Sequence, residues 1–217
     1  MSKKIPIITE PVKRNFGLVD LQANDEGNVI EGHPAVYDQK TLIGGWFYEI
    51  IERGAFDGCD FDDVLFCYNH DLQRIPLARS RRNNANSTMQ LKTDEIGIHV
   101  RASLDIENNA EAKTVYSAVK RKDIDGMSFI FYVAKGGETW EDLDTDTPTR
   151  RIKKIAKVIE VGPVNFPAYI GTDINARDQS VLDNAAKALE NARSQLDNSK
   201  SEQLEALRIK TQILMKG

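Results

Sequence analysis

Apolar and polar residues alternate with a period of two through much of the chain between residues 29 and 164, and this pattern predicts β-strands. The clearest run is 98–104, in which every second residue is apolar. The runs 127–133 and 155–161 follow the same period, and the apolar run 64–68 is typical of a buried strand. Polar or glycine-containing breaks separate these runs, so we predict many short strands.

One segment within this β region has helical spacing instead. Asn108 and Asn109 offer an N-cap, and Arg121 suits the C-terminal end of a helix. The apolar residues between them recur at the spacing of one helix face: Ala112, Val115, Tyr116 and Val119. Short strands around one embedded helix predict a mainly β fold with some α, namely a small β-barrel with helices packed outside it.

The pattern changes again after Arg177, where the chain carries no proline, no aromatic residue and no glycine before its last position. Leucines recur there every seven residues, at Leu182, Leu189 and Leu196. The polar stretch 198–202 interrupts this stripe, and further leucines predict a second helix: Leu204, Leu207 and Leu214. We therefore expect a helical tail of two helices, whose narrow apolar stripe favours docking or helix pairing over chemistry.

These patterns divide the chain into an N-terminal arm at 1–28, a β-rich domain at 29–177 and the tail at 178–217. No run approaches the ~20 apolar residues that cross a bilayer, and no apolar signal-peptide stretch follows the first residues, so we expect a cytosolic protein. The formal net charge is −4, and no aromatic residue interleaves the basic runs 79–82 and 150–154. Direct nucleic-acid binding is therefore disfavoured, and both runs are interpreted as solvated surface.

Three residues are candidates for catalysis, although each has an ordinary structural alternative. His70 directly follows the strand at 64–68, and strand ends are where rigid scaffolds present reactive groups. Ser128 lies within the strand at 127–133, where a serine is usually only a small polar residue. Glu160 falls on an otherwise apolar strand face, which indicates either an edge position open to water or a partner for an imidazole.

The other histidines and both cysteines carry less weight. His33 precedes Pro34 in an expected turn, and His99 alternates onto the polar face of its strand, where we expect it to be exposed and idle. Cys59 and Cys67 lack a basic neighbour that would form a thiolate, so they are interpreted as reduced, partly buried thiols.

The acidic clusters do not predict a metal site. Asp142, Asp144 and Asp146 have the spacing that begins a calcium loop, but Thr147 and Lys153 occupy the positions where such a loop needs glycine and glutamate. The aspartates between 57 and 63 have no nearby histidine or cysteine set suited to zinc, and no glycine-rich phosphate loop is present. We expect neither a metal nor a cofactor.

Several short motifs, taken in order, resemble the prohead (capsid maturation) serine proteases of tailed phages. The matching segments are Gly-His-Pro-Ala-Val-Tyr at 32–37, Glu-Arg-Gly-Ala-Phe at 52–56, Asn-His-Asp at 69–71 with Leu-Ala-Arg-Ser at 77–80, Asp-Gly-Met-Ser-Phe at 125–129, and Glu-Val-Gly-Pro-Val-Asn-Phe-Pro-Ala-Tyr at 160–169. Each motif is unspecific alone, but their order and spacing are specific. Departures from the family pattern are Ala78 in place of a frequent glycine, Gly162 in place of a frequent serine, and an insertion at 81–88.

This resemblance implies a fold similar to the herpesvirus assemblin proteases and an enzyme that cuts capsid precursors. It implies Ser128 as nucleophile, His70 as base and Glu160 as the third member of the triad. Since Pro167 has no N–H, the oxyanion donors would be Ala168 and Tyr169. The implied partners are the major capsid protein precursor and its scaffolding segment, inside the prohead in the bacterial cytoplasm, with self-association through the tail as a further possibility.

A non-catalytic assembly protein is the competing hypothesis: a protease-like barrel whose tail nucleates capsid assembly. The presence of both Ser128 and His70 favours the enzyme, whereas the tail is compatible with either. A metal-dependent hydrolase is a distant third.

Overall fold

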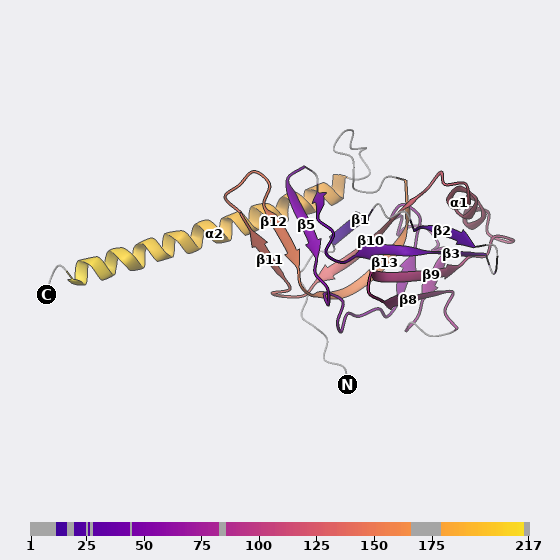
Figure 1. Cartoon of the computed structure of the whole chain (residues 1–217), viewed down its shortest axis with the longest axis horizontal. Helices are drawn as coiled ribbons and strands as arrows, with labels where there is room; N and C mark the ends of the chain where they lie inside the picture. The colour runs from indigo at the N-terminus through magenta and orange to yellow at the C-terminus, as the bar shows by residue number, and fades with distance from the viewer. Residues whose placement is uncertain are drawn as a thin grey trace.

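The computed structural model describes residues 12–16, 20–24, 26, 28–43, 45–82, 86–165 and 179–214. Three sheets and two helices make up this part of the chain (Figure 1). A five-stranded sheet has the order β1 (Val12–Phe16), β10 (Gly126–Val133), β13 (Ile155–Val164), β6 (Val64–Phe66), β7 (Ala78–Ser80). A second sheet has the order β11 (Glu138–Glu141), β12 (Thr149–Ile152), β5 (Phe47–Ile51), β4 (Thr41–Ile43), and a third has the order β2 (Gln22–Asn24), β3 (Val29–Val36), β9 (Gly97–Ser103), β8 (Met89–Thr93).

The alternation in the sequence predicts the core correctly where a sheet has one buried face. In β9, Ile98 and Val100 are fully buried, whereas Arg101 between the apolar positions is exposed. Strand β10 differs, because its residues 126–131 are buried on both faces. One continuous core contains residues from all three sheets, including the stacked rings of Phe129 and Phe131, 4.5 Å apart.

The expected β-barrel is wrong, because none of the three sheets closes on itself within the described residues. Strands β7 and β8 belong to different sheets, and the Thr88 hydroxyl lies where backbone hydrogen bonds would join them. It accepts a hydrogen bond from the Arg79 N–H (2.9 Å) and donates one to the Arg79 carbonyl (3.3 Å). Because one side chain satisfies both outward-facing backbone groups of Arg79, a ladder to β8 cannot form there.

Helix α1 (Ala110–Lys120) confirms the predicted helix and its cap. The Asn109 side chain accepts hydrogen bonds from the N–H groups of Glu111 and Ala112, and Arg121 forms the C-cap. The four apolar residues predicted to share one face are all buried: Ala112, Val115, Tyr116 and Val119. The sequence pattern therefore specifies both the ends and the orientation of this helix.

Helix α2 (Gln179–Leu214) is one continuous helix, so the expected break into two helices near Ser199 is wrong. The stretch 198–202 is polar but contains neither glycine nor proline, so it interrupts the apolar stripe without interrupting the backbone. Neither described helix is both long enough and apolar enough to cross a membrane.

The first half of α2 docks on the body of the protein. Leu189 packs in a small cluster with Ile43 and Phe47, and Arg193 donates hydrogen bonds to the carbonyls of Leu143 (3.3 Å) and Thr145 (2.9 Å). The second half projects away from the body (Figure 1), and its apolar residues are exposed: Leu204, Leu207 and Ile209.

Buried charge supports the sheet on which α2 docks. Arg150, which we expected on the surface, is buried and donates to Glu49 (3.1 Å) and to Glu138. A basic run in the sequence cannot show that a carboxylate 101 positions earlier will face one of its members.

We predict that Leu189→Ala lowers the free energy of unfolding by about 2 kcal/mol or more, because it removes buried methyl groups beneath the helix. Leu207→Ala is the matched control and should change stability by less than about 0.5 kcal/mol, since its side chain is exposed. Denaturant unfolding measures both, and equal losses would contradict the described docking.

Candidate active site

His70 reaches the site through a sharp turn at the end of β6. Asn69 and His70 both have left-handed backbones, with φ of 56° and 59°. Each such residue costs roughly 1–2 kcal/mol unless its surroundings hold it. The Asn69 N–H donates to the Pro163 carbonyl (3.0 Å), and the Asn69 side chain accepts from the Asn165 N–H (3.4 Å). These bonds tie the turn to the end of β13.

Sheet register brings Ser128 and Glu160 together. Strands β10 and β13 are antiparallel, with Ser128 opposite Gly162 and Ile130 opposite Glu160. Residues two apart on a strand share a face, so Ser128 and Glu160 are diagonal neighbours on one face of the sheet. Both residues are fully buried. Glu160 thus lies inside the sheet, and an edge position open to water is excluded for it.

The imidazole of His70 joins these two residues. The Ser128 hydroxyl is hydrogen-bonded to Nε2 of His70, and Nδ1 of His70 is 2.6 Å from Oε2 of Glu160. With the proton on Nδ1, the ring donates to the carboxylate, and Nε2 can accept the serine proton. The three residues singled out in the sequence therefore form one hydrogen-bonded chain, although 58 and 90 positions separate His70 from its two partners.

Gly162 provides the space that this arrangement needs. A Cβ at position 162 would lie 1.8 Å from the carbonyl oxygen of Cys67 and 3.1 Å from Oε1 of Glu160. The Cys67 N–H donates to the Val161 carbonyl (3.2 Å), and His70 follows three residues later. Glycine therefore allows β6 to approach β13 closely enough for the imidazole to reach the carboxylate. Any side chain at this position would force these strands apart.

Other candidates are excluded or lie elsewhere. Asp71, the acid nearest to His70 in sequence, is half-exposed and pairs with Arg74 (3.2 Å). Burial raises the pKa of Cys59 and of Cys67 to about 12, which keeps both thiols protonated and inert. Ala168 and Tyr169, the expected oxyanion donors, lie outside the described residues.

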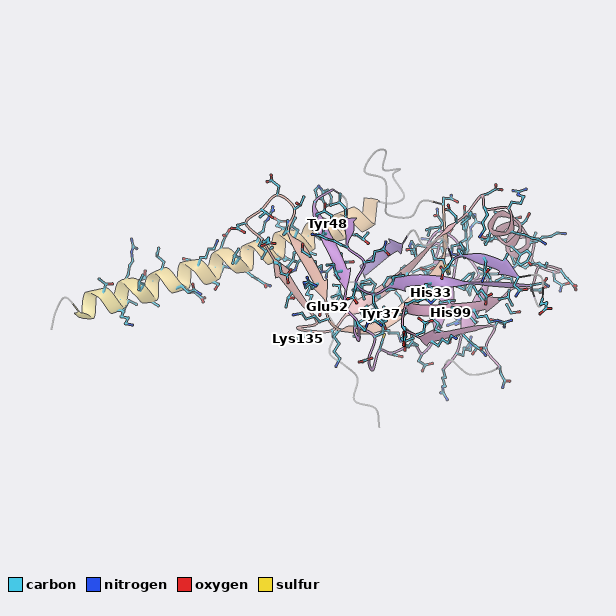
Figure 2. The ribbon with its side chains drawn as sticks, in the orientation of Figure 1. His33, Tyr37, Tyr48, Glu52, His99 and Lys135 are labelled. Carbon is cyan, nitrogen blue, oxygen red and sulfur yellow. The ribbon has the colours of Figure 1, made fainter. Side chains whose placement is uncertain are left out.

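His33 is the polar feature that the sequence interpretation missed. It is not in a turn but in β3, at an irregularity of the β3–β9 pairing, and it is buried. One ring nitrogen faces Asp20 and the other faces Asp94 (3.0 Å). Figure 2 shows His33 beside His99, whose ring packs edge-on against it at 5.1 Å. His99 is therefore half-buried rather than exposed.

Two carboxylates around one imidazole favour its charged form, because only an imidazolium can donate from both nitrogens. Burial alone lowers the pKa of His33, but the bonds to Asp20 and Asp94 outweigh it and leave that pKa raised. Burial also opposes ionisation of Asp94, yet the bond from His33 and the N–H groups of Gly97 and Ile96 bring the pKa of Asp94 down to about 2. Burial and the neighbouring His33 lower the pKa of His99.

The serine, imidazole and carboxylate form the kind of site on which serine hydrolases rely. The family model of the caudovirus prohead serine proteases matches residues 18–187, which is most of the chain. The chain belongs to this family of serine peptidases, and the resemblance drawn from the short motifs is confirmed. Neither a curated protein nor a solved structure matches the chain.

We predict that Gly162→Ala lowers the free energy of unfolding by about 1–3 kcal/mol, because the methyl group meets a backbone carbonyl that cannot move alone. Gly136→Ala is the control: its left-handed backbone (φ 71°) costs about 1 kcal/mol, but nothing lies within 4 Å of the added carbon. Denaturant unfolding compares the two variants. If the alanine at 162 were tolerated better than the alanine at 136, the close approach would be refuted.

We predict that His33→Gln destabilises the protein more at pH 5.5 than at pH 9. A raised folded-state pKa contributes stability that is fully present below the unfolded value of 6.5 and is lost as pH rises through the folded pKa. Glutamine cannot carry the charge that bridges the two carboxylates. Chemical unfolding of wild type and variant across this range measures the difference, and a pH-independent difference would show that folding does not raise the pKa of His33.

Proposed function

We propose that this chain is a serine endopeptidase that cuts phage capsid and scaffold precursors during prohead maturation. Ser128 is the nucleophile, His70 the general base and Glu160 the orienting acid. The observation that carries the proposal is the hydrogen-bonded chain Ser128–His70–Glu160, built from three separate elements of a chain that belongs to a serine peptidase family. An intact nucleophile and base also favour this function over a non-catalytic assembly role.

The chemistry follows from the positions of the protons. A serine hydroxyl is a weak nucleophile until a neutral imidazole takes its proton, so Nε2 of His70 accepts that proton as Oγ of Ser128 attacks the peptide carbonyl. The imidazolium then lies against the buried carboxylate of Glu160, which stabilises it. His70 next gives the proton to the departing amine, the peptide bond breaks, and water releases the acyl group by the same route.

The tetrahedral intermediate carries a negative oxygen that needs backbone donors. We propose the N–H groups of Ala168 and Tyr169 for this role, since they follow the strand that carries Glu160 and Pro167 before them has no N–H. The proposed substrates are the major capsid protein precursor and its scaffolding segment, met inside the prohead in the bacterial cytoplasm. Helix α2 contributes none of the three proposed catalytic groups.

We predict that Ser128→Ala abolishes cleavage of the capsid precursor while the protein remains folded, and that adding His70→Ala costs little more because triad members act as a unit. Glu160→Gln should lower turnover by about 10²–10⁴-fold. Asp71→Asn is the matched control and should retain activity, since Asp71 pairs with Arg74. Co-expression with the capsid precursor, read by intact mass, shows activity and cleavage site together. Cleavage by Ser128→Ala protein would refute the proposal.

A further inference from the structure

Strand β1 lies beside the strand that carries the proposed nucleophile. Residues Val12–Phe16 pair antiparallel with β10 and form the edge of the five-stranded sheet, with Asn15 directly opposite Ser128 (Figure 1). The family match covers residues 18–187, so this strand lies before the matched region. A strand outside the matched region thus adjoins the proposed catalytic serine.

Strand β10 has two edges, and they differ in what they can accept. One edge pairs with β13, which carries Glu160. Along the other edge, β10 pairs with β1 in the part of the chain that the structure describes. An edge of this kind binds any extended polypeptide through its main chain, as in recognition by strand addition. It is therefore a surface on which a peptide substrate can align.

The spacing suits attack by Ser128. A strand on this edge lies about 4.8 Å from β10, so its backbone passes beside Ser128, whose side chain lies on one face of the sheet. A carbonyl there needs to move only a short way to come within about 3–3.5 Å of the hydroxyl oxygen. With β1 in place, however, Ser128 is fully buried and this edge is filled.

The arm is anchored immediately after β1. Asp20 lies four positions beyond Phe16, accepts the His33 N–H (3.2 Å), and faces the His33 ring. The next carbonyl, that of Leu21, accepts from Nζ of Lys122 (2.7 Å). A strand tethered this closely has an effective concentration on the order of mM at β10, so a weakly pairing sequence is enough to occupy the edge.

We propose that the edge of β10 opposite β13 is the substrate-binding edge, and that residues 12–16 occupy it as an autoinhibitory strand. The enzyme is latent until an extended segment of substrate displaces β1. This inference rests on the proposed function, since it assigns a role to the surface next to Ser128. It also accounts for His33: the imidazolium that holds Asp20 fixes the arm where β1 can reach the serine.

Proline substitutions test the proposal with a control built into the strand. Alternate N–H groups of an edge strand point toward its single neighbour, so one of Arg14→Pro and Asn15→Pro removes a hydrogen bond to β10 and the other removes an N–H that faces away. Each variant is treated with a fluorophosphonate, whose P–F bond breaks as Oγ of Ser128 bonds to phosphorus and fluoride leaves. Mass spectrometry follows the labelling rate, with Ser128→Ala as the blank.

We expect wild type to label slowly, one proline variant to label at least tenfold faster, and the other to behave like wild type. A synthetic peptide with the sequence of residues 10–18 should slow the fast variant again. If wild type and both proline variants label at Ser128 at the same rate, the autoinhibitory role of β1 is refuted, while the proposed function still holds. No labelling of Ser128 in any form would overturn the proposed function, and this inference with it.

A second measurement avoids any dependence on proline. A cleavage site for a sequence-specific protease is inserted between Leu18 and Val19, and the folded protein is labelled before and after cutting. Cutting turns the tethered strand into a free peptide, so labelling should accelerate at least tenfold on dilution. A rate unchanged by cutting, in protein whose circular dichroism is also unchanged, would refute the role of β1.

Discussion

The carboxylate of Glu160 is the constraint on which the site depends, because it lies fully buried in the middle of a sheet. An ionised carboxylate in such a place costs several kcal/mol unless it is paired. His70 is its partner at 2.6 Å, and the local backbone is arranged to deliver that partner. The left-handed turn at residues 69–70 orients the imidazole ring. Gly162 lets the chain at the end of β6 come close enough to β13 for the ring to reach Glu160. The strained turn at residues 69–70 and the glycine at position 162 are thus both explained by the need to pair one buried charge.

The two buried imidazoles show how surroundings decide the use of a histidine. His70 has one carboxylate and one hydroxyl, so one nitrogen is committed to Glu160 and the other can take up a proton. His33 has a carboxylate on each side, and both nitrogens are committed as donors. The first arrangement is suited to proton transfer, whereas the second acts as a fixed positive bridge between distant segments.

Features specified by local pattern could be predicted from the sequence. The face of α1 and its Asn109 cap depend on residues within one or two turns, and the buried positions of β9 depend on simple alternation. Glu160 was recognisable because a carboxylate interrupts an apolar face, which signals a buried partner.

Features that depend on distant pairs were not predictable. Asp94 is 61 positions from His33, and no local signal connects them. The missing pairing between β7 and β8 at Arg79 reflects the Thr88 hydroxyl, a contact that periodicity cannot indicate. The continuous tail was missed for a different reason: a break in the apolar stripe was interpreted as a break in the backbone, although 198–202 contain no residue that ends a helix.

Helix α2 also has a hydrodynamic consequence. Its 36 residues form a rod about 54 Å long, of which the distal half stands clear of the body. A compact chain of 217 residues would have a radius of gyration of about 17 Å. A monomer with this rod therefore diffuses more slowly than its mass implies and elutes early from a gel-filtration column, at the position of a larger globular species. Light scattering or sedimentation equilibrium, which report mass rather than size, would give its true state of assembly.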